Sequence, residues 1–137
     1  MSSRKLDDLR PEIRPQVDAF LAACEAAGLD VLVTCTLRSN DEQAALYAKG
    51  RTVAPIGRRW VVTDAPAGKS AHNYGLAIDI VPMIGGKPDW QGADPVWQQV
   101  GKLGVAAGLE WAGTPGFPFP EEPHMQHPNW RVLAGLD

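Results

Sequence analysis

A carboxylate in the middle of an apolar run constrains this chain more than any other feature. The run Leu76-Ala77-Ile78-Asp79-Ile80-Val81 has the length and composition of a buried strand. An ionised Asp79 is costly to bury there unless a cation or strong hydrogen-bond donors satisfy it. Two partners would do so: an arginine of the core, or a metal ion. The fold must therefore bring other polar groups to this strand.

The three histidines of the chain favour the metal ion. His72 precedes Asp79 by seven residues, and His124 and His127 stand in the segment 121–127, which begins with two glutamates. Two histidines and one aspartate form a plausible zinc site, in which three protein ligands leave a fourth position for water, as catalytic zinc requires. A carboxylate three residues before a histidine ligand could act as general base on that water. No HExxH motif fixes the geometry.

Mixed helical and extended segments predict an α+β fold in one domain spanning residues 1–137. Helices are predicted over 11–27, 40–48 and 95–107, and strands over 30–36, 76–81, 110–112 and 124–126. Pro11 suits the first turn of the first helix, although Pro15 could delay its start, and Gly28 is a stop signal. The second helix opens with a capping box, either at Ser39 or shifted by one residue to Asn40. A short extended stretch is expected over 59–63.

Composition excludes several classes of protein. The formal charge of −3 argues against a nucleic-acid partner held by bulk positive charge. No apolar run is long enough for a membrane helix, and the acidic N-terminal segment does not resemble a secretory signal. Cys24 and Cys35 form no CxxC motif, and we expect both to be buried, reduced thiols.

Two blocks of the sequence together resemble a known family, the LAS zinc peptidases. These include D-Ala-D-Ala enzymes of the VanX and VanY types and phage L-alanyl-D-glutamate endopeptidases. The first block is the pattern Ser70-x-His72-x-x-Gly75-x-Ala77-x-Asp79, followed downstream by an acid-x-x-His. The second block is upstream and consists of Thr36-Leu37-Arg38-Ser39 with Gln43, Leu46, Tyr47, Gly50 and Arg51. Residues 67–75 look most like the phage endolysin branch.

The resemblance implies a fold and a metal site. The fold is a small antiparallel sheet with helices packed around it and a zinc site in a groove, as in the hedgehog and LAS proteins. His72, Asp79 and His124 would hold Zn²⁺. Glu121 falls at the position of the catalytic acid/base, although the adjacent Glu122 could compete for that role.

The resemblance also implies roles for residues around the metal. Arg38 would face the substrate and stabilise the tetrahedral oxyanion. Gln43 and Ser70 fall where relatives line the substrate groove, but they could equally be a helix-surface amide and a turn hydroxyl. His127, three residues beyond His124, would point to the opposite face of a strand and is expected outside the ligand set. Among the tryptophans, Trp111 is expected closest to the metal.

The implied activity is that of an endolysin, a zinc-dependent peptidoglycan endopeptidase that cuts the L-Ala–D-Glu bond of the stem peptide. It would be a monomer, made in the cytoplasm without a signal peptide, and would need a hole-forming protein to reach the cell wall. One alternative is a D-Ala-D-Ala carboxypeptidase or dipeptidase of the same family. A second is a zinc-containing wall-binding module without turnover, and a third is a metal-free domain in which Asp79 pairs with Arg38.

Overall fold

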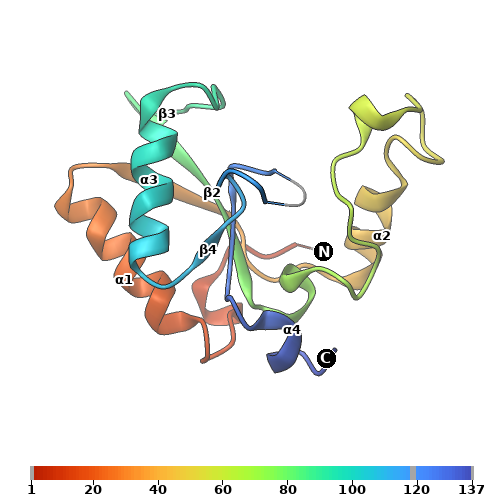
Figure 1. Ribbon diagram of the computed structural model, residues 1–137, viewed down its shortest axis with the longest axis horizontal. Helices are drawn as coiled ribbons and strands as arrows, with labels where there is room; N and C mark the ends of the chain where they lie inside the picture. The colour runs from red at the N-terminus through yellow and green to blue at the C-terminus, as the bar shows by residue number, and fades with distance from the viewer. Residues whose placement is uncertain (1, 118–119, 137) are drawn as a thin grey trace.

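An antiparallel sheet runs through the centre of the molecule (Figure 1). The computed structural model describes residues 2–117 and 120–136. Four strands lie in the order β1 (Asp30–Cys35), β2 (Ala77–Ile84), β5 (His124–Gln126) and β4 (Glu110–Trp111), and β3 (Lys87–Pro88) pairs with the far end of β2. Every pairing is antiparallel. The predicted α+β fold with a small antiparallel sheet is therefore confirmed.

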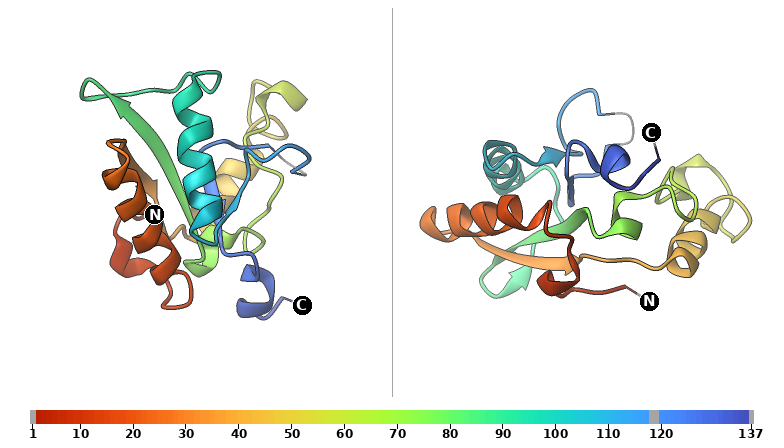
Figure 2. Two further views of the ribbon diagram at one scale, coloured as in Figure 1. Left: turned by 60° about the vertical axis from the view of Figure 1, so that its left-hand side comes forward. Right: turned by 90° about the horizontal axis from the view of Figure 1, so that it is seen from below.

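Two long helices cover one face of the sheet. They are α1 (Arg14–Ala26) and α3 (Pro95–Ala106), which lie side by side in Figures 1 and 2. Helix α2 (Asn40–Ala48) and the loop after it project on the other side of the molecule, and α4 (Trp130–Leu133) lies near the C-terminus. Three short 3₁₀ helices complete the structure: η1 (Leu6–Asp8), η2 (Arg58–Trp60) and η3 (Ala71–Tyr74).

Small residues let α3 approach the sheet closely. A Cβ atom at Gly101 would collide with the indole of Trp111, and one at Gly104 would collide with the sulfur of Met125. Met125 is paired with Ile78 of β2, so these apolar side chains share the helix-covered face. The pleat then places Asp79 on the opposite face, away from α1 and α3. The functional side chains gather on that second face.

Some local predictions are confirmed and others are wrong. Ser39 is the N-cap of α2, because its side chain accepts a hydrogen bond from the backbone N–H of Glu42 at 3.1 Å. Gly28, with φ of 72°, ends the first helix as expected. That helix begins at Arg14 rather than near Pro11, so Pro15 occupies its first turn, where a missing N–H costs nothing. η2 occupies the start of the extended stretch expected over 59–63, and the backbone is extended only from Val61, after that turn.

Among the described residues, no helix combines the length and the apolar character needed to span a membrane.

Candidate metal centre

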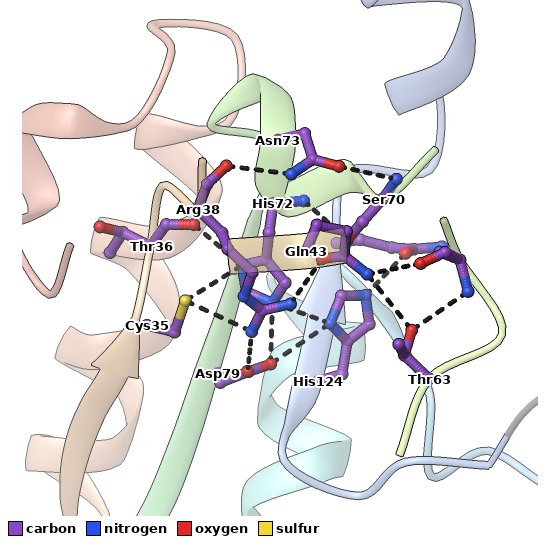
Figure 3. A network of polar contacts seen from close by, with 12 residues as sticks. Cys35, Thr36, Arg38, Gln43, Thr63, Ser70, His72, Asn73, Asp79 and His124 are labelled. Carbon is purple, nitrogen blue, oxygen red and sulfur yellow. Dashed lines mark hydrogen bonds and ion pairs between the residues drawn. The ribbon is translucent and has the colours of Figure 1, made fainter. Parts of the chain in front are cut away.

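Three polar side chains from separate parts of the chain converge on the open face of the sheet (Figure 3). His72 comes from η3, Asp79 from the middle of β2 and His124 from the start of β5. The sheet register sets Asp79 directly opposite His124. His72 Nε2 lies 2.9 Å from Asp79 Oδ1, and His124 Nδ1 lies 3.2 Å from His72 Nε2 and 3.3 Å from Asp79 Oδ1. The side chains are therefore brought together as the sequence predicts.

These separations fit a small tetrahedral metal ion. Zinc binds histidine nitrogen and carboxylate oxygen at about 2.0–2.1 Å, which places neighbouring ligand atoms about 3.3 Å apart in a tetrahedron. The three observed distances, 2.9, 3.2 and 3.3 Å, are close to that value. Two imidazoles and one carboxylate also match the nitrogen and oxygen ligands that zinc takes. The residues present fit Zn²⁺.

The turn that carries His72 is fixed by its own sequence. Ser70 caps η3: its hydroxyl accepts a hydrogen bond from the backbone N–H of His72 at 3.3 Å, and Asn73 Oδ1 accepts one from the backbone N–H of Ser70 at 3.2 Å. Gly75 ends the turn with φ of 67°, a conformation that favours glycine. On the far side of the ring, His72 Nδ1 lies 2.8 Å from the carbonyl oxygen of Thr36. This contact makes Nδ1 the donor and leaves Nε2 facing Asp79.

Asp79 uses its two oxygens for different partners. Oδ1 faces the histidines, while Oδ2 lies 3.3 Å from Nη2 of Arg38. The arginine partner and the possible metal partner of Asp79 are therefore both available, and they do not compete for the same oxygen. Burial alone would raise the pKa of Asp79, but His72 and His124 outweigh it and hold that pKa well below its usual range.

Without a metal, the contact with the Asp79 carboxylate favours the protonated form of His72. Burial acts to lower the pKa of this imidazole, and the adjacent Asp79 carboxylate more than offsets it, raising the pKa from 6.5 to about 10. His72 is almost completely buried, with 1% of its surface exposed. Metal binding at this position must therefore displace a proton.

Cys35 lies behind His72. Its sulfur is 3.7 Å from His72 Nδ1 and 3.5 Å from Arg38 Nη2. Cys35, His72 and Asp79 are close enough to form a metal-binding group of their own. The sulfur of Cys35 lies beside Nδ1 of His72, which already contacts the Thr36 carbonyl, whereas Asp79 and His124 both lie beside Nε2. The set with His124 therefore fits one ion better. Cys24 and Cys35 are both buried and free, as predicted.

Arg38 is held in place by several partners. Nη1 donates to Oε1 of Gln43 at 3.0 Å, Nη2 faces Asp79 and Cys35, and the buried Nε has no hydrogen-bond partner among the described residues. Gln43 is fully buried, and its Nε2 donates to the carbonyl oxygen of Ala65 at 2.7 Å. The amide of Gln43 is thus occupied by the protein and lies outside the cavity wall. It orients Arg38 instead of lining a groove.

His72 and His124 border a cavity of about 260 Å³, whereas Asp79 is not among its wall residues. Arg38, Lys69, Ser70 and Glu121 also line it. Burial raises the pKa of Glu121 above its usual value, with Asp79 adding to the rise and His124 opposing it. A wider groove of about 1160 Å³ shares several wall residues with this cavity, among them Lys69.

Glu122, Trp111 and His127 lie outside this cavity. The carboxylate of Glu122 packs against Gly92. Trp130 lines the cavity, whereas Trp111 lines the wider groove, contrary to expectation. Trp111 packs against α3 on the helix-covered face of the sheet, and its indole N–H donates to the Glu122 carbonyl at 2.7 Å. His127 turns to its own loop, where Nδ1 accepts a hydrogen bond from the backbone N–H of Asn129 at 3.0 Å.

Two contributors to the site were missed in the sequence. His124 Nε2 contacts Oε1 of Gln126 at 2.7 Å, and Gln126 Nε2 donates to Oε1 of Glu110 at 2.6 Å. The alternation of side chains along a strand could have predicted the contact between His124 and Gln126, because residues 124 and 126 must share a face. The position of Glu110 depends on the pairing of β4 with β5, which no local pattern indicates.

Comparisons with known proteins identify relatives of this chain. Residues 6–109 match the family model described as VanY, D-alanyl-D-alanine carboxypeptidase. The chain is 35% identical over 127 residues to the peptidoglycan L-alanyl-D-glutamate endopeptidase CwlK of Bacillus subtilis (strain 168), covering 87% of this chain and 73% of that protein.

Solved structures share the fold. The L-Ala D-Glu endopeptidase ChiX of Serratia marcescens aligns with a TM-score of 0.67 at 19% identity, covering 98% of this chain and 92% of that one. A vancomycin-resistance D,D-pentapeptidase VanY from a VanB-type cassette, solved with Zn(II), aligns with a TM-score of 0.60 at 16% identity. The alignment covers 93% of this chain and 78% of that one.

Proposed function

The chain belongs to the family of VanY D-alanyl-D-alanine carboxypeptidases, and on this premise we propose that it is a zinc-dependent endopeptidase that cuts the L-Ala–D-Glu bond of the peptidoglycan stem peptide. The observation that carries the proposal is the convergence of His72, Asp79 and His124, of which the two histidines line one cavity together with Glu121. The choice of bond is supported by the 35% identity to CwlK, a peptidoglycan L-alanyl-D-glutamate endopeptidase.

His72, Asp79 and His124 would hold the metal in this reaction. When bound, zinc supplies a Lewis acid that polarises a carbonyl group and makes water a better nucleophile at neutral pH. Three protein ligands leave room for the reacting groups, which distinguishes a catalytic zinc site from a structural one.

Glu121 moves the proton. Its carboxylate accepts a proton from the water that attacks the scissile carbonyl, and it returns that proton to the amine when the C–N bond breaks. The products are a carboxylate on L-Ala and a free amine on D-Glu. A general base works best when its pKa lies near the working pH, and burial shifts the pKa of Glu121 upward, in that direction.

Arg38 stabilises the charge that develops on the carbonyl oxygen. It lines the cavity and is held by Gln43 and Asp79, so it needs little reorganisation when the oxyanion forms. Ser70 also lines the cavity, and we propose that it contacts the substrate in addition to capping η3.

The biological role that we propose is that of an endolysin, released to the cell wall with the help of a hole-forming protein. It is supported by the likeness of residues 67–75 to phage endolysins. A second candidate is a D-Ala-D-Ala carboxypeptidase, which the description of the matching family model favours. Both candidates use the same metal and the same base.

A digest of purified peptidoglycan distinguishes these activities. We expect mass spectrometry to find new D-Glu amino termini, which disappear with a chelator and return when zinc is added. Loss of terminal D-Ala, without new D-Glu termini, would move the enzyme to the carboxypeptidase branch. If folded, zinc-loaded protein releases no fragments, the chain is a wall-binding module and the proposal is wrong.

A further inference from the structure

Two successive hydrogen bonds lead from His124 across the sheet, first to Gln126 and then to Glu110. The ring nitrogen Nε2 lies 2.7 Å from Oε1 of Gln126, and Nε2 of Gln126 lies 2.6 Å from Oε1 of Glu110. The sheet builds this arrangement: Gln126 follows His124 by two residues on β5, and Glu110 lies directly opposite Gln126 on β4. All three side chains are at least partly buried.

The chemistry of the groups fixes which atom donates and which accepts in each of these two hydrogen bonds. An ionised carboxylate only accepts hydrogen bonds, so Glu110 must face the NH₂ group of Gln126. The amide oxygen of Gln126 then faces His124, and because that oxygen can only accept, His124 Nε2 must carry the hydrogen. The lone pair of the neutral imidazole is left on Nδ1, the nitrogen that lies 3.2 Å from His72 and 3.3 Å from Asp79.

We propose that Gln126 and Glu110 are positioning residues, which fix the tautomer and the ring orientation of His124 so that Nδ1 binds the metal. Hydrogen-bond partners behind a metal-binding histidine orient the ring and raise its basicity. The backbone carbonyl of Thr36 does this for His72, whereas His124 depends on two side chains. The inference rests on the proposed function, because it takes His124 as a metal ligand.

Zinc affinity, measured by competition with a chromophoric chelator, tests the roles of Gln126 and Glu110 without reference to cleavage. Gln126→Leu removes the acceptor for Nε2, and we expect zinc affinity to fall about 10- to 100-fold. Gln126→Glu should also weaken binding, because the new carboxylate would face Glu110 across the present 2.6 Å contact.

An exchange of the two residues gives the sharpest test. In the double variant Glu110→Gln with Gln126→Glu, the amide at 110 donates to the carboxylate at 126, which accepts from His124 Nε2. His124 Nε2 still donates its hydrogen to residue 126, so we expect zinc affinity to return to within about threefold of the wild-type value. A residue that only packed in the sheet would not be rescued by this exchange.

A matched control and a second readout keep the outcomes separate. Gln91→Leu alters an exposed glutamine and should leave zinc affinity unchanged. In the zinc-loaded protein, NMR should show a protected Nε2–H on His124. Unchanged affinity in Gln126→Leu, or zinc bound through Nε2, would overturn the inference. Failure of the wild-type protein to bind zinc would instead overturn the proposed function.

Discussion

Glu121→Gln should reduce peptidoglycan cleavage by about 10²- to 10⁴-fold, the range attributed to a general acid–base group. The amide keeps the size of the side chain but cannot accept the proton from water. Glu121 lines the cavity, and its hydrogen bond to His124 joins backbone atoms, the N–H of His124 donating to the Glu121 carbonyl at 3.0 Å. A change of the side chain leaves that bond in place, so we expect zinc content and melting temperature to stay close to the wild-type values. Cleavage rate and bound zinc should be measured on the same preparation.

The neighbouring glutamate provides the matched control. Glu122→Gln makes the same chemical change one residue later, where the carboxylate packs against Gly92 and does not line the cavity. It should cleave at nearly the wild-type rate. A large loss in Glu122→Gln together with normal cleavage in Glu121→Gln would reverse the assignment of the base.

Asp79→Asn should weaken zinc binding by at least about 100-fold, more than the loss of an outer hydrogen-bond partner. The amide retains the shape of the side chain but removes the negative charge that faces His72, His124 and Arg38. Cleavage at a fixed, low zinc concentration should fall in parallel, and excess zinc should restore part of it.

The same variant should alter the pH dependence of the metal-free protein. Asp79 raises the folded-state pKa of His72 from 6.5 to about 10, so this pair stabilises the fold fully below about pH 6.5 and loses its effect as the pH rises toward 10. The lowered pKa of Asp79 contributes above its ordinary value of 3.8 and is lost in more acidic solution. The difference in the free energy of unfolding between wild type and Asp79→Asn should thus be largest near pH 5–6 and narrow toward pH 10.

Cys35→Ala is the control for the ligand set. Cys35 lies 3.7 Å from His72 Nδ1 and belongs to the other metal-binding group that the structure allows. We expect this variant to keep its zinc affinity, because the Thr36 carbonyl already occupies Nδ1. A loss as large as that of Asp79→Asn would mean that the metal is bound by Cys35.

The sequence was most informative where a residue contradicts its surroundings. Asp79 in an apolar strand indicates a buried charge with a partner, and the structure gives it Arg38 and the two histidines. The helical spacing of Val17, Phe20 and Cys24 predicts the buried face of α1. Each inference uses only the chemistry of a residue and the period of its element.

What the sequence did not predict depends on contacts between distant segments. Gln43 is buried because residues 63–65 fold over α2 and take its amide, a contact with no local signature. The Glu110–Gln126 contact depends on the register of β4 against β5. The two oxygens of Asp79 serve Arg38 and the histidines separately, which the sequence could only state as alternatives.

The central claim is that His72, Asp79 and His124 hold the catalytic metal. Anomalous diffraction at the zinc edge, from crystals of the active protein, tests it most directly. We expect one zinc ion bound by His72 Nε2, His124 Nδ1 and the Asp79 carboxylate, with a remaining coordination position open to the cavity of Glu121. Zinc bound by Cys35 without His124, or an active protein with no metal at these three residues, would contradict the account.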